Sequence, residues 1–127
     1  MTRVLVVDDE PPIAELVQEI LQEEGYLVES AGSAAAAFGR LEQHWPDVML
    51  LDLHMPTMDG WTFLRACRQD RRGADLRVVV MSCAQEEHRV EEPGVAFLAK
   101  PFDINILLRT VHQVLLPTAI LGPMLIS

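Results

Sequence analysis

The chain has 127 residues, half of them hydrophobic and 23% charged, and its formal net charge is −9. This length corresponds to one domain, the composition excludes a disordered chain, and an acidic chain with scattered arginines is not expected to bind nucleic acid directly. The N-terminus leaves no room for a signal peptide and no apolar run reaches membrane-spanning length, so we expect a cytoplasmic protein that does not bind a membrane.

Short apolar runs alternate along the chain with segments of helical periodicity. In chain order the predicted elements are a strand at 4–7, a helix at 11–24, a strand at 26–29, a helix at 33–41, a strand at 48–51, a helix at 60–69, a strand at 76–81, a helix at 84–92, a strand at 95–99 and a helix at 103–115. Most of the strands are continuously apolar, which is typical of a parallel sheet covered on both faces. The pattern predicts an α/β fold with a doubly wound five-stranded parallel sheet.

Polar residues interrupt the predicted strands at their carboxyl ends. Three acids at 8–10 end the first strand, Asp52 ends the third, Ser82 the fourth and Lys100 the fifth. In a parallel sheet these ends share one edge, where open α/β folds bind ligands. Converging carboxylates need a cation, and a few oxygen ligands suit Mg²⁺. Since a carboxylate can accept a phosphoryl group that a lysine and a serine contact, the set predicts phosphoryl transfer to Asp52.

Four motifs occur along the chain: VLVVDDE (4–10), MLLDLHMPTMDG (49–60), VVVMS (78–82) and FLAKPF (97–102). Together they closely resemble the receiver domain of two-component response regulators, including the chemotaxis regulators. The resemblance covers nearly the whole chain and implies a receiver domain at 1–116 with a flavodoxin-like strand order, 2-1-3-4-5. It also implies a signalling switch rather than an enzyme, with chemistry limited to its own phosphoryl transfer and autodephosphorylation.

The resemblance implies a phosphoacceptor and a metal site. Asp52 is the expected acceptor, which takes its phosphoryl group from a histidine kinase or a phosphotransfer protein. Asp9 and Asp52 are the expected direct side-chain ligands of Mg²⁺, with Asp8 assisting through water, and the backbone carbonyl of His54 is the further protein ligand.

The remaining motif residues are implied to read the phosphorylated state. Ser82 and Lys100 each contact a phosphoryl oxygen, and the bond between Lys100 and Pro101 is expected to be cis. Phe97 turns into the space that Ser82 leaves, which changes a protein–protein interaction surface. The output partner or effector domain is not specified by the sequence.

Two positions depart from the family pattern. The segment from Ser82 to Lys100 is shorter than usual by about one helical turn, which predicts a short or irregular fourth helix. His54 follows the acceptor by two residues, and it either tunes dephosphorylation or donor access, or is a solvent-facing loop side chain.

The apolar tail at 117–127 has three interpretations: it packs on the domain, forms a homodimer contact, or begins a truncated linker to an effector domain. The alternative function is a phosphorylation-independent interaction module built on the same fold. An aspartate-nucleophile phosphatase is the weaker rival, because such enzymes carry a second acid at the position of His54.

Overall fold

The computed structural model describes residues 1–56, 58–82 and 94–116. The expected helix at 84–92 and the apolar tail at 117–127 therefore lie outside the described residues. One parallel sheet is built from five strands: β1 (Arg3–Val7), β2 (Leu27–Ala31), β3 (Val48–Asp52), β6 (Arg77–Ser82) and β7 (Val95–Ala99). Their order is β2-β1-β3-β6-β7, which confirms the predicted order 2-1-3-4-5.

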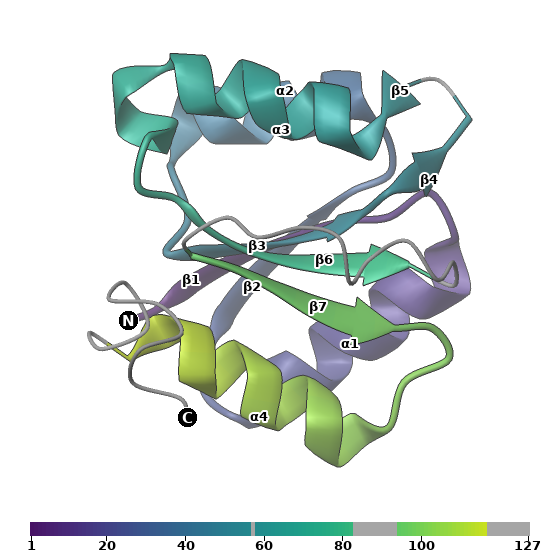
Figure 1. Ribbon diagram of the computed structural model, residues 1–127. Coiled ribbons are helices and arrows are strands. Elements are labelled where there is room, and N and C mark those ends of the chain that lie inside the picture. The colour runs from purple at the N-terminus through teal and green to yellow at the C-terminus, as the bar shows by residue number, and fades with distance from the viewer. Residues whose placement is uncertain (57, 83–93, 117–127) are drawn as a thin grey trace.

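Helices cover both faces of the sheet. Figure 1 shows α2 (Ala34–Gln43) and α3 (Gly60–Gln69) on one face, and α1 (Pro11–Glu23) and α4 (Ile104–Leu115) on the other. Each pair of helices packs against alternate side chains of the strands, which creates two hydrophobic clusters separated by the sheet. The doubly wound fold predicted from the alternating runs is confirmed. Among the described residues, no helix is long and apolar enough to cross a membrane.

Local sequence signals account for the helix boundaries. Ser33 caps α2, with its side chain accepting a hydrogen bond from the Ala36 N–H at 3.1 Å, and Asp103 caps α4 in the same way. Proline occupies the first turn of α1, where a missing N–H costs nothing. The chain leaves that helix through Gly25, whose positive φ of 93° favours glycine.

Three short elements were not predicted. β4 (His54–Met55) and β5 (Met58–Asp59) form an antiparallel pair directly after β3, and η1 (Arg71–Gly73) is one turn of 3-10 helix. Elements of two or three residues are too short to show a hydrophobic period. The small β4–β5 hairpin places His54 beside Asp52, whose Oδ1 accepts a hydrogen bond from the His54 N–H.

A close backbone contact behind the site requires glycine at position 60. A Cβ atom on Gly60 would lie 2.7 Å from the Cα of Leu53 and 3.1 Å from the carbonyl oxygen of Asp52. We expect Gly60→Ala to lower the free energy of unfolding by about 2 kcal/mol, because backbone atoms must move to make room. Urea denaturation measures the change.

Gly39 offers a matched control for this prediction, because a Cβ atom there would meet nothing within 4 Å. Gly39→Ala lies inside α2 and is expected to raise the free energy of unfolding by about 0.5 kcal/mol, since alanine is the better helix former. Equal unfolding midpoints for Gly60→Ala and the unmodified chain would show that the backbone behind Asp52 yields without cost.

Candidate functional site

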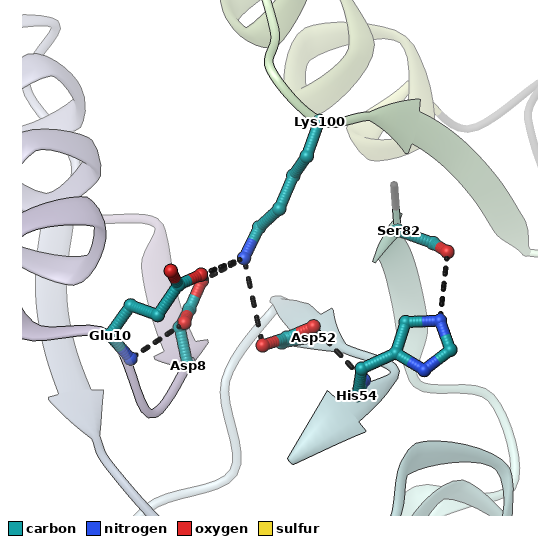
Figure 2. Close-up of polar contacts among 6 residues, drawn as sticks. All are labelled: Asp8, Glu10, Asp52, His54, Ser82 and Lys100. Atoms are coloured by element: carbon teal, nitrogen blue, oxygen red, sulfur yellow. Dashed lines mark hydrogen bonds and ion pairs between the residues drawn. The ribbon is translucent and has the colours of Figure 1, made fainter. Parts of the chain in front are cut away.

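The polar residues that end the predicted strands do meet at one edge of the sheet. Parallel pairing places Leu51 beside Val7, Asp52 beside Met81 and Ser82 beside Ala99, so that these strands end at similar heights. Figure 2 shows the side chains that follow: Asp8, Glu10, Asp52, His54, Ser82 and Lys100. The predicted convergence is therefore present in the structure.

Asp52 is held in an enclosed position at the end of β3. Its residue surface is 4% exposed, and its Oδ1 accepts a hydrogen bond from the backbone N–H of His54 at 3.0 Å. Burial is the main cause that raises its pKa above the ordinary 3.8, and the carboxyl groups of Asp8 and Asp9 act in the same direction. The His54 hydrogen bond and the Lys100 charge oppose this rise in the pKa without cancelling it.

Lys100 reaches from the end of β7 into the acidic group. Its Nζ donates to Asp8 Oδ2 at 2.8 Å and to Glu10 Oε1 at 3.1 Å, and it lies 3.6 Å from Asp52 Oδ2. Burial is the largest single effect and lowers the pKa of Lys100, but the hydrogen bonds to Asp8 and Glu10 and the charges of Asp8 and Asp52 together raise it above 10.5. The ammonium group thus balances part of the negative charge that the three acids bring together.

A set of carboxylates in this cluster can hold a cation. Oxygens of Asp8, Glu10 and Asp52 lie within 4.8 Å of one another, and all of them are hard ligands of the kind that Mg²⁺ takes. The carboxyl group of Asp9 also interacts with Asp52, since it contributes to the raised pKa of Asp52. The donor chemistry fits Mg²⁺.

Glu10 had no assigned role in the sequence analysis, although it belongs to the same run of acids. Its backbone N–H donates to Asp8 Oδ1 at 2.9 Å, and its side chain turns back to Lys100. In the sequence, the only sign that Glu10 belongs to the site was its position next to two acids at the end of a strand. That position did not predict its contact with Lys100.

Ser82 lies at the end of β6 and is 1% exposed. Its Oγ is 3.3 Å from Nε2 of His54, and Figure 2 shows the hydroxyl group pointing toward that ring. The structure therefore brings the predicted switch serine together with the unusual histidine.

Phe97 lies on β7, which is separated by β6 from β3, the strand that carries Asp52. Its half-buried ring packs against the cluster on the α2–α3 face and meets the ring of Trp61 edge-on, with centroids 6.3 Å apart. Further along the same chain segment, the Lys100–Pro101 bond is cis, as the motif implied.

A hollow of about 550 Å³ adjoins the acidic cluster. Its lining includes Asp9 and residues of the β4–β5 hairpin, among them His54 and Asp59. Two residues that border the hollow also act on Asp52: the carboxyl group of Asp9 raises the pKa of Asp52, and the His54 N–H donates to Asp52 Oδ1.

Comparisons with known proteins agree with the geometry. The sequence model of the response regulator receiver domain matches residues 4–112. Response regulator Rre1 of Synechocystis sp. is 37% identical in an alignment of 116 positions, which covers 87% of this chain and 50% of that protein. The DNA-binding dual master transcriptional regulator RpaA of the same organism is 34% identical, over 91% of this chain and 49% of that protein. The chain spans about half the length of these relatives.

Solved structures show the same fold. The chemotaxis protein CheY4 of Vibrio cholerae superposes with a TM-score of 0.83 at 30% identity, covering 90% of this chain and 98% of that one. A relative of similar length also exists, a 14.6 kDa protein of Leptolyngbya boryana that is 34% identical over 87% of both chains.

Proposed function

The chain belongs to the response regulator receiver domain family, and from this we propose that it is a phosphoacceptor switch in which Asp52 takes a phosphoryl group. The observation that carries the proposal is the position of Asp52: an enclosed carboxylate with an ammonium group 3.6 Å from its Oδ2. A buried acid whose pKa is raised by burial, beside a cation at the edge of a parallel sheet, is typical of a functional site.

In the proposed reaction, a carboxylate oxygen of Asp52 attacks the phosphorus atom of a phosphohistidine. The new O–P bond forms as the P–N bond breaks, and the donor imidazole leaves with the bonding pair. Lys100 supplies a fixed positive charge to one phosphoryl oxygen. The Ser82 hydroxyl group can donate a hydrogen bond to another phosphoryl oxygen. Later attack by water on the phosphorus atom returns Asp52 to its carboxylate form and releases phosphate.

We propose that Asp8, Asp9, Asp52 and the backbone carbonyl of His54 hold Mg²⁺. Bound there, the ion supplies positive charge that neutralises phosphoryl oxygens during transfer. Lys100 contacts both Asp8 and Asp52, so it has to share these carboxylates with the metal. The proposed donor is a histidine kinase or a phosphotransfer protein, and the proposed output is a change around Phe97 that a partner detects.

Intact-mass analysis after incubation with acetyl phosphate tests the function. We expect one phosphoryl adduct that requires Mg²⁺ and is absent in Asp52→Asn. Asp59→Asn is the control, because this exposed acid also lies in the acceptor motif and caps α3. No adduct with any phosphodonor, in a protein that binds Mg²⁺, would favour the alternative, a phosphorylation-independent interaction module.

A further inference from the structure

The side chain of His54 has no part in the proposed reaction, which uses only its backbone carbonyl. The main chain at this residue is well anchored: its N–H donates to Asp52 Oδ1 at 3.0 Å, and it pairs with Asp59 across the β4–β5 hairpin. Leu53 and Met55 on either side are buried, whereas His54 itself is exposed. The backbone therefore holds the imidazole in a fixed position directly beside Asp52.

Ser82 is held just as firmly by its backbone. It pairs with Ala99 in the sheet, and its carbonyl oxygen accepts a hydrogen bond from the Lys100 N–H at 3.0 Å. Rotation about the Cα–Cβ bond is the motion left to its side chain, with three staggered positions for the hydroxyl group. In the observed position Oγ lies 3.3 Å from His54 Nε2, and it points toward the ring rather than toward Asp52 (Figure 2).

From this geometry we infer that His54 is a positioning residue that holds the Ser82 hydroxyl in the unmodified state and opposes its move to a phosphoryl group on Asp52. A serine has one O–H and one Oγ, so turning the hydroxyl toward Asp52 breaks the contact with Nε2. The inference rests on the proposed function, and it gives the imidazole a role in setting the balance of the switch. One hydrogen bond of this kind changes the equilibrium constant between the two hydroxyl positions by about threefold to tenfold.

Beryllofluoride, a tetrahedral mimic of the phosphoryl group, measures that balance without a chemical step. The full chain is titrated with beryllofluoride at saturating Mg²⁺, and backbone amide signals in NMR spectra give the half-saturating concentration. We expect His54→Ala to lower this concentration about threefold to tenfold. His54→Gln keeps a polar group that can hold the hydroxyl and is expected to restore much of the difference. His44→Ala removes an exposed imidazole at the end of α2 and is expected to change nothing.

A second variant separates positioning from a general structural effect. In a Ser82→Ala background the ring has no hydroxyl group to hold, so adding His54→Ala should leave the half-saturating concentration unchanged. An equal effect of His54→Ala with and without Ser82, no effect at all, or weaker binding of the mimic would overturn the inference. If the unmodified chain fails to bind beryllofluoride with Mg²⁺ present, the proposed function itself is wrong.

Discussion

Replacing Lys100 by methionine is expected to lower the free energy of unfolding of the Mg²⁺-free protein by about 3 kcal/mol. The Asp8 side chain is fully buried and the Lys100 side chain is only 13% exposed, and their charged atoms lie 2.8 Å apart. Methionine keeps the apolar stem but leaves Asp8 without its cation, beside Asp52. Removing one partner of a buried ion pair destabilises the fold far more than breaking an exposed ion pair does, because the charge that remains is buried without a partner. Urea denaturation in the presence of a chelator measures the loss.

Arg40 and Glu29 form the matched control. Their ion pair spans 3.4 Å, and its side chains are 44% and 36% exposed. Arg40→Met is expected to cost less than about 1 kcal/mol, because water already screens this pair. We further expect Mg²⁺ to stabilise Lys100→Met more than the unmodified chain, since the ion no longer competes with an ammonium group. Losses of equal size in Lys100→Met and Arg40→Met would show that the acidic group does not depend on the lysine.

The sheet could be predicted from the sequence because its central strands are buried on both faces. The run at 48–51 is continuously apolar, and all of β3 is buried. The edge strand β2 was predicted at 26–29 but lies at Leu27–Ala31, since Ser30 and Ala31 pair with the end of β1. A half-polar edge strand has a weaker pattern, so pairing with its neighbour determines its boundaries.

The meeting of the acids, Ser82 and Lys100 was equally predictable, because parallel strands end along one edge. Their individual pairings were not. His54 and Ser82 are 28 residues apart in sequence, and Glu10 and Lys100 are 90 apart. Such contacts depend on side-chain rotamers and on the β4–β5 hairpin, for which the sequence carried no periodic signal.

Asp52→Asn is expected to have the opposite effect from Lys100→Met and to raise the free energy of unfolding of the Mg²⁺-free protein at neutral pH by about 1 kcal/mol. Burial and the neighbouring acids Asp8 and Asp9 make the charged carboxylate unfavourable, which is why its pKa is raised. Asparagine removes the charge and keeps an oxygen that can accept the His54 N–H. Asp75→Asn, at an exposed acid, is the control and should stay within about 0.5 kcal/mol of the unmodified chain.

The pH dependence of this gain distinguishes charge from shape. Because the pKa of Asp52 is raised above 3.8 in the folded chain, the folded state holds the proton more tightly than the unfolded state does. Above the raised pKa, the ionised carboxylate therefore lowers the stability of the folded chain by its full amount. This loss disappears as the pH falls through the raised pKa toward 3.8. The advantage of Asp52→Asn should vanish over the same interval in urea denaturation curves recorded from neutral to acid pH. A gain in stability that persists at acid pH would come from packing. At neutral pH, Mg²⁺ should make the unmodified chain more stable than Asp52→Asn, because only the carboxylate is a strong ligand.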